Sequence, residues 1–261
     1  MNVFVFHLGA MVLGLIRATG EICFLLADLV KTLFTRPLRW RQFLRQMYFT
    51  GLRSQTIILV TGGFSGAVFT AQILFRFREM GMSTATGPVV AVAMCRELGP
   101  VLCALMLAGR VGSSIAAELS TMRLTEQLDA LRALAVPPTE YLLIPRFLAV
   151  TLSTPILVGL SMAVGIAASW VVAVMIMDID GAYYIAHMTQ YMEPKDVAIG
   201  LIKACFFGLI IALVGIYKGL NAGHGAEGVG QATTNAAVHA SLIVLVSNFF
   251  FSFLLNAIFP A

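Results

Sequence analysis

The sequence predicts an all-α integral membrane protein with about five transmembrane helices. The chain has 261 residues, of which 59% are hydrophobic and only 11% are charged, whereas soluble domains average about 25% charged residues. Its long apolar runs are of the length that crosses a bilayer as a helix, about 20 residues. Most charges lie between these runs, which leaves too little polar surface for a soluble fold of this size.

Residues 1–50 are predicted to form N-terminal interfacial helices, ahead of a transmembrane domain over residues 51–261. Two apolar runs in the first part are interrupted by charges at Arg17, Glu21, Asp28 and Lys31. Since neither run reaches about 20 uncharged residues, helices lying in the membrane interface fit better than spans. Pro37 predicts a break between two such helices.

The first span is predicted over Leu52–Phe75, and the second from Pro88 to about Ile115. The first contains Gly62 and Gly66 in a G-x-x-x-G pattern, which lets two helices approach closely. This face and the fifth span are therefore candidate contacts with a second copy of the chain.

A charged amphipathic helix is predicted between the second and third spans, over Glu118–Val136. Leucines recur at helical spacing on one side, and the other side carries Arg123, Glu126, Asp129 and Arg132. Pro137 and Pro138 end this helix. A charged surface next to a membrane span indicates a helix that couples the spans to a soluble partner.

The remaining spans are predicted over Tyr141–Met177, Val197–Tyr217 and Ala236–Phe259. Asp178–Lys195 is a polar connection with several tyrosines, typical of a membrane interface, and Gly219–Gln231 is a glycine-rich loop.

The basic residues predict the orientation. Seven of the 17 Lys and Arg residues lie at or before Arg53, whereas the connection from Asp178 to Asp196 holds one lysine. Because basic residues favour the cytoplasmic side, five spans place the N-terminus and the coupling helix in the cytoplasm and the C-terminus outside.

Three charged residues, Arg96, Glu97 and Lys203, can be placed well inside the predicted spans. Arg96 is eight residues past Pro88 and Lys203 is seven past Asp196, so both lie about 10–12 Å from the outer end at about 1.5 Å per residue. Arg96, Glu97 and Lys203 thus share one layer, where an ionised group costs at least about 2.5–3.5 kcal/mol. Such groups must pair or face water.

This layer has two interpretations. Two cations against one carboxylate leave a positive charge, which suits a phosphate headgroup whose acyl chains would lie against Phe69, Leu74 and nearby residues. Alternatively, the three residues form a network that only holds helices together.

Other chemistry has little support in the sequence. Cys23, Cys95, Cys103 and Cys205 form no C-x-x-C pair and are expected to be small buried hydrophobes. The four histidines lack metal-ligand spacing, and no serine, histidine and acid set is evident, so neither a metal site nor a catalytic site is predicted. Without a Gly-Lys pair there is no Walker A loop, so another chain would hydrolyse any ATP. The net charge of +4 is concentrated near the N-terminus, which favours membrane orientation over nucleic-acid binding.

Two stretches carry a family resemblance. Arg96–Ala149, which opens RELGPVLCALMLAGRVGSS, closely resembles the signature of the MlaE (YrbE) permease family. These permeases are membrane subunits of bacterial ABC systems that move phospholipids between the inner and outer membranes. Gly228–Leu245, GVGQATTNAAVHASLIVL, resembles the same family's C-terminal motif. The similarity covers about residues 40–258, with departures at Pro137-Pro138 and at Asn248, where the family often has an acid.

The resemblance implies a homodimeric inner-membrane permease that holds phospholipid between its two copies and maintains outer-membrane lipid asymmetry. It implies no cofactor in this chain, a cytoplasmic ABC ATPase dimer that binds ATP and Mg, and a periplasmic MCE-domain ring similar to MlaD. A small cytoplasmic STAS-domain protein is a further optional partner.

The resemblance also implies roles for particular residues. Arg96, Glu97 and Lys203 match polar cavity positions, and EQLDALRALAV matches the helix that docks on the ATPase. The expected coupling residues are Glu118, Glu126, Gln127, Asp129 and Arg132. Two other classes remain open: an ion-coupled carrier that uses the charged layer without ATP, and an intramembrane enzyme that changes its lipid with Glu97 as acid or base.

Overall fold

The computed structural model describes residues 2–258, with the side chains of residues 13, 14 and 16–258. Five helices in this part of the chain are long and apolar enough to cross a membrane, which confirms the predicted number of spans. They are Trp40–Glu79, Ser83–Leu124, Thr139–Ile176, Pro194–Leu220 and Gly225–Ile258.

Most of the spans are built from several helical segments in line. The first contains α2 (Trp40–Met47), η1 (Tyr48–Leu52) and α3 (Arg53–Glu79). The second contains η2 (Ser83–Ala85), α4 (Thr86–Ala93), η3 (Met94–Leu98), α5 (Gly99–Leu107), η4 (Ala108–Gly112) and α6 (Ser113–Leu124). The third contains η5 (Thr139–Leu143), α8 (Ile144–Val171) and η6 (Val172–Ile176), and the last two are α10 (Pro194–Leu220) and α11 (Gly225–Ile258). Apart from the 3₁₀ turn η2, the η segments are π-helical turns, which are often found at functional sites.

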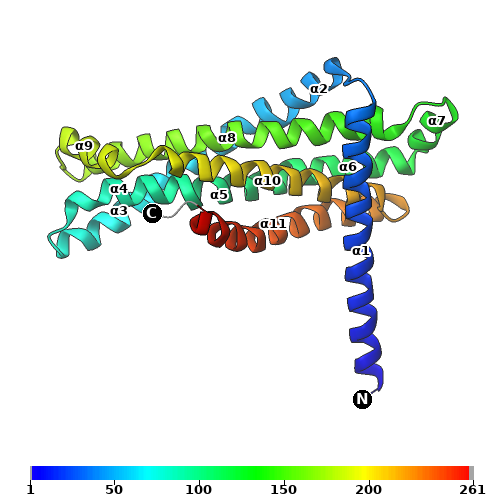
Figure 1. Ribbon diagram of the computed structural model, residues 1–261, viewed down its shortest axis with the longest axis horizontal. Coiled ribbons are helices and arrows are strands. Elements are labelled where there is room, and N and C mark those ends of the chain that lie inside the picture. The colour runs from blue at the N-terminus through cyan, green and yellow to red at the C-terminus, as the bar shows by residue number, and fades with distance from the viewer. Residues whose placement is uncertain (1, 259–261) are drawn as a thin grey trace.

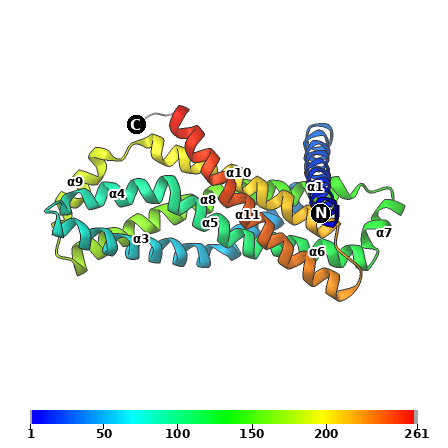
Figure 2. The same cartoon turned by 90° about the horizontal axis from the view of Figure 1, so that it is seen from below.

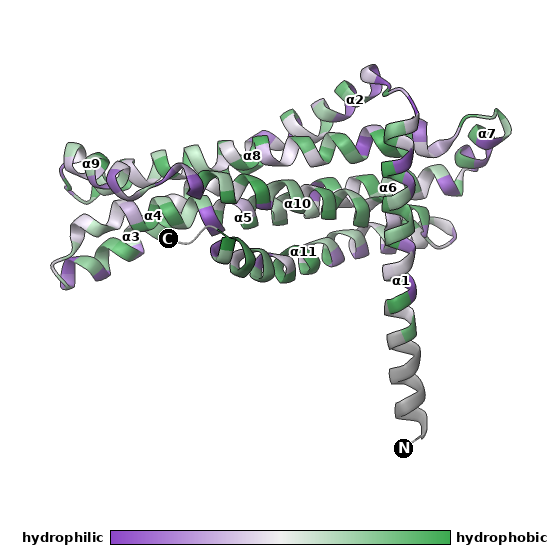
Figure 3. Ribbon diagram, viewed as in Figure 1, coloured by the Kyte–Doolittle hydropathy of each residue, from purple (hydrophilic) through white to green (hydrophobic). Residues whose placement is uncertain are grey.

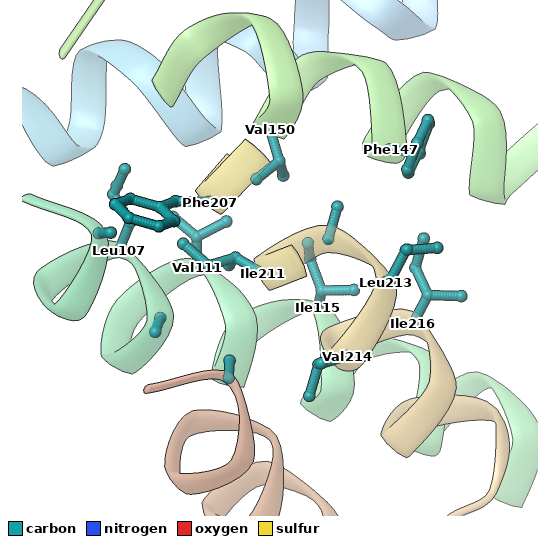
Figure 4. Close-up of a cluster of buried hydrophobic side chains, with 14 of the residues drawn as sticks. Leu107, Val111, Ile115, Phe147, Val150, Phe207, Ile211, Leu213, Val214 and Ile216 are labelled. Carbon is teal, nitrogen blue, oxygen red and sulfur yellow. The ribbon is translucent and has the colours of Figure 1, made fainter. Parts of the chain in front are cut away.

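Helices α3, α8 and α10 run along one common axis, with α8 packed between the other two, and α11 crosses them obliquely (Figures 1 and 2). Helix α10 also packs on α6 and α11. The shared core of the spans lies where α5, η4 and α6 face α8 and α10. Figure 4 shows Leu107, Val111 and Ile115 meeting Val150 of α8 and Phe207 and Ile211 of α10. Apolar residues line most of the length of the spans, and hydrophilic residues gather at the α7 end and at the tip of α3 (Figure 3).

The G-x-x-x-G face of α3 makes its close contact inside the chain. A Cβ atom added to Gly66 would lie 2.2 Å from the carbonyl oxygen of Gly165 on α8, and one added to Gly62 would lie 2.8 Å from that of Ser161. The expectation that this face touches a second copy is therefore wrong. The motif does allow a close helix approach, but its partner is α8.

Helix α1 (Asn2–Thr35) lies outside the bundle, nearly perpendicular to the spans and toward the α7 end (Figures 1 and 2). Leu29 is buried, Glu21 accepts a hydrogen bond from Tyr217 at 2.9 Å, and Asp28 accepts one from Thr139 at 3.1 Å. The break at Pro37 is confirmed, since α1 ends at Thr35 and α2 begins at Trp40. The interfacial position of this helix stays a prediction.

The charged segment after the second span is two helices rather than one. Helix α6 continues the span to Leu124, and α7 (Gln127–Ala133) begins after Glu126, whose φ of 55° is left-handed. The expectation of one helix over Glu118–Val136 is therefore wrong. Leucine spacing alone does not show the break between α6 and α7, because Leu128 still packs inward after it.

The polar connection between the third and fourth spans also contains a helix, α9 (Gly181–Tyr191). Its first turn is capped by Asp180, which accepts a hydrogen bond from the Tyr183 backbone N–H at 2.7 Å, as short polar side chains do at helix starts. Tyr184 fixes α9 to the bundle, with its hydroxyl 3.2 Å from Ser169 Oγ and its ring next to Gly87. Burial raises the pKa of this phenol.

Candidate functional site

The three charged residues predicted to share a layer do lie together. Lys203 is 1% exposed. Its ammonium group donates to Glu97 Oε1 at 2.8 Å, to the Arg96 carbonyl at 2.8 Å and to Ser252 Oγ at 2.7 Å. An ammonium group has three N–H donors, so this lysine is fully occupied by the protein itself.

Local sequence explains why a side chain reaches the Arg96 carbonyl. Arg96 and Glu97 lie in the π-helical turn η3, and Gly99 and Pro100 follow it. Proline has no N–H to donate to the carbonyl four residues earlier in a helix. Lys203 donates to that carbonyl from the neighbouring span, and so ties α10 to the second span.

The layer also contains a carboxylate that sequence reasoning had placed at the membrane edge. Asp196 is 2% exposed and accepts from Arg96 Nε at 2.5 Å. It also accepts from the Glu193 backbone N–H at 2.9 Å, which caps the start of α10. With Arg96 and Lys203 facing Glu97 and Asp196, the expectation of a net positive layer is wrong.

The fifth span contributes three further residues that sequence reasoning did not select as site residues. Asn248 Nδ2 donates to Glu97 Oε2 at 2.9 Å, Ser252 Oγ donates to Glu97 Oε1 at 2.9 Å, and Asn256 Oδ1 accepts from Arg96 Nη1 at 3.0 Å. Their spacing of four residues puts them on one helix face. This row of polar residues in an apolar span is the feature of the sequence that could have identified them as site residues.

The polar layer borders a pocket of about 620 Å³. Its lining is mostly apolar and comes from the start of the second span and from α9: Thr84, Ala85, Pro88, Val89, Val92, Ala93, Arg96, Glu97, His187 and Tyr191. The side chain of Glu97 is 42% exposed and that of Arg96 is 19% exposed. These two residues, rather than Lys203, are therefore the charges that a ligand in the pocket could reach.

The two apolar residues expected to contact acyl chains do not line this pocket. Leu74 is fully buried inside the chain, so in this conformation it offers no surface to a lipid; Phe69 is half-buried. Burial of Cys95 and Cys103 is confirmed, but the same expectation is wrong for Cys23 and Cys205, which are exposed.

The predicted coupling residues fall into two groups. Glu118 belongs to α6, and its exposed carboxylate lies 2.9 Å from Nη2 of the buried Arg146. The others lie at or in α7, where Glu126 and Gln127 form its start and Asp129 pairs with Arg132 at 2.7 Å on an exposed surface. The α7 group lies beyond Leu124, where the second span ends, whereas Glu118 lies six residues before that end.

Comparison with known proteins gives one consistent family. The family of permease MlaE matches residues 43–254. A probable ABC transporter permease protein of Synechocystis is 44% identical over 82% of this chain and 82% of its own length, and one of Rickettsia conorii is 42% identical over 84% and 85%. The intermembrane phospholipid transport system permease protein MlaE of Haemophilus influenzae is 36% identical over 94% of this chain and 95% of its own length. This multi-pass membrane protein therefore belongs to the MlaE permease family.

Proposed function

We propose that this chain is the membrane subunit of an ABC transporter that moves phospholipids between the inner and outer membranes, and that Arg96 and Glu97 receive the lipid headgroup. The observation that carries this proposal is the 620 Å³ pocket, which combines an apolar wall with two accessible charges. A two-chain lipid needs both features. The name of the Haemophilus relative agrees with this substrate class.

The charges of the polar layer suit a headgroup that carries both signs. Arg96 uses its Nε and one Nη1 hydrogen for Asp196 and Asn256, and a guanidinium has five N–H donors, so donors remain for a phosphate. The partly exposed Glu97 carboxylate can accept an ammonium group. Lys203 positions Glu97 from behind.

Arg96→Ala is expected to weaken lipid retention by about tenfold or more, because a charge-assisted hydrogen bond in a partly dry site contributes about 1.5–3 kcal/mol. The measurement is lipid crosslinking and ATP-driven lipid transfer with the complete complex in vesicles. Arg76→Ala is the matched control, since Arg76 lies exposed at the tip of α3. Equal lipid binding and transfer by both variants would show that Arg96 does not receive the headgroup.

The same vesicles separate this function from its two alternatives. Lipid transfer that follows an ion gradient without ATP would indicate a carrier. A chemically changed lipid would indicate an enzyme.

We further propose that the permease works as a homodimer with a lipid between the copies. Support comes from α11, whose most apolar stretch is only 17% buried, against 56% for α10. It exposes large side chains at Phe249, Phe250 and Phe253. The proposed assembly adds a cytoplasmic ATPase dimer carrying ATP and Mg, a periplasmic MlaD-like ring and, optionally, a STAS-domain protein. The N-terminus then lies in the cytoplasm and the C-terminus in the periplasm.

Helix α7 is the proposed docking element for the ATPase. It projects from one end of the bundle (Figure 1) and exposes Asp129, Arg132 and Leu134, while Leu128 fixes it to the bundle. A helix held to the bundle by one buried anchor presents its exposed charges to a soluble partner, where they would fix the register of docking.

Charge reversal on α7 is expected to uncouple the transporter. The double variant Glu126→Lys, Asp129→Lys should reduce ATP-driven lipid transfer by about tenfold or more, because like charges placed in an interface oppose docking. Copurification of the ATPase and transfer in vesicles are the two measurements. Glu79→Lys, an exposed reversal at the other end of the bundle, is the control. Wild-type assembly and transfer in the double variant would refute docking through α7.

A further inference from the structure

We propose that a second pocket, near the end of the bundle that carries α7, binds the phosphate of an anionic phospholipid from the adjacent leaflet. We name it the arginine pocket. Its volume is about 400 Å³, and it is lined by Gln42, Arg45, Gln46, Phe49, Glu118, Met122, Tyr141, Leu142, Pro145 and Arg146. It is formed by other segments than the 620 Å³ pocket that Arg96 lines. The proposal is therefore independent of the function proposed for that pocket.

The first argument is a buried cation with unused donors. Arg146 is 5% exposed, and its Nη2 lies 2.9 Å from Glu118 Oε2. Its Nε and Nη1 atoms are buried, and no hydrogen-bond acceptor reaches them within the described residues. A buried donor left in this way costs about 1–3 kcal/mol, and more when it is charged. An oxyanion in the pocket would remove that cost.

The second argument is the excess of positive charge. A smaller adjoining pocket shares Gln46, Phe49 and Glu118 with the arginine pocket and adds Arg53 and Arg110 to the lining. The two linings together contain four arginines, Arg45, Arg53, Arg110 and Arg146, and one acidic residue, Glu118. The Arg53 and Arg45 guanidinium groups also lie 4.5 Å and 5.9 Å from the centre of the Phe49 ring, which holds their charges near the pocket. One guanidinium group can donate two parallel hydrogen bonds to two oxygens of the same phosphate.

The third argument is depth. Glu118 lies six residues before Leu124, the end of its span, and Arg146 lies seven residues after Thr139, the start of the next. At about 1.5 Å per residue both lie about 9–11 Å inside the helix ends. Because these helix ends extend beyond the hydrocarbon core, the pocket lies near the depth of lipid headgroups.

An apolar pocket on the same elements favours a lipid over a free phosphate compound. It measures about 390 Å³ and is lined mainly by Leu44, Met47, Tyr48, Leu52, Ile156, Leu157 and Leu160. Its α8 residues follow Arg146 along the helix, toward the middle of the span. A polar site at headgroup depth and an apolar site farther in match the order of head and tail in a lipid, whereas a soluble anion would need only the first.

The test places a photoreactive amino acid at Gln46, which lines both the arginine pocket and the smaller adjoining pocket. The complete transporter is reconstituted in phosphatidylcholine vesicles with a minor share of phosphatidylglycerol, illuminated, and analysed for lipid adducts by mass. We expect phosphatidylglycerol adducts several-fold above its share of the bilayer. Arg45→Gln should lower this enrichment about threefold, as for a solvent-exposed charge contact, and Arg146→Gln about tenfold.

Two controls make the result specific. Arg41→Gln removes another exposed arginine of α2 that does not line the pocket, and Arg76→Gln removes an exposed arginine at the tip of α3; neither should change the adducts. If Arg146→Gln fails to fold, Arg45→Gln against Arg41→Gln decides the question. Adducts that follow the bilayer composition, or equal effects of these two variants, would overturn the proposal. A probe at Gln46 that is protected by inorganic phosphate but gives no enrichment of phosphatidylglycerol adducts would overturn the lipid source and identify a site for free phosphate.

Discussion

Lys203→Ala is expected to lower the stability of the chain by about 3 kcal/mol and to abolish transport. The substitution removes an ammonium group that is 1% exposed and donates to Glu97, to the Arg96 carbonyl and to Ser252. Breaking a buried ion pair by removing one partner costs about 3–5 kcal/mol. The lower end applies here because Glu97 is 42% exposed and can be hydrated. The measurement is the thermal unfolding midpoint of the purified permease.

Lys218→Ala is the matched control on the same helix, because Lys218 is only half-buried and its ammonium group lies 5.8 Å from the centre of the adjacent Tyr217 ring. It should unfold like the parent. A Lys203→Ala protein that keeps the parent's unfolding midpoint but loses lipid would contradict the positioning role. That result would instead favour the original expectation, in which Lys203 contacts the phosphate directly.

The number of spans was predictable because about 20 apolar residues are needed to cross a bilayer as a helix, and this requirement is visible in composition alone. Their ends were not. The second span was expected to stop near Ile115 but continues as α6 to Leu124, because a helix does not have to end where the hydrocarbon does. The break between α6 and α7 depends on the left-handed backbone of Glu126. Leucine spacing does not reveal this conformation.

The charged layer was predictable in part because helical rise fixes depth. Arg96 and Lys203 could be placed at one level by counting residues from the span ends. The pairing could not be found that way, since Asp196, Asn248, Ser252 and Asn256 reach the layer only through the packing of three spans. Because Asp196 was not counted, the layer was expected to carry a net positive charge. That expectation led to a purely anionic ligand.

The contact made by the small residues of the first span also depends on how the spans pack. A G-x-x-x-G pattern shows that a helix will approach another closely, but it does not say which one. The candidates were a second copy and any other span of the same chain. Only the fold shows that the partner is α8.

Gly66→Ala is accordingly expected to destabilise each chain by about 3 kcal/mol, whether or not a second copy is bound. The new Cβ would lie 2.2 Å from the Gly165 carbonyl oxygen and 2.7 Å from its carbon. These are backbone atoms inside α8, so they cannot turn aside as a flexible side chain would. Overpacking of a well-packed core costs about 1–3 kcal/mol, sometimes more, and the upper end applies because whole helices must separate.

Gly109→Ala is the control, since a Cβ there meets nothing within 4 Å and alanine favours a helix over glycine by about 1 kcal/mol. Thermal unfolding of both variants should be measured at several protein concentrations. A loss for Gly66→Ala that is the same at every concentration identifies a contact within one chain. A loss that appears only where copies associate would return this face to the dimer interface, because a contact between copies is weakened by dilution and one between α3 and α8 is not.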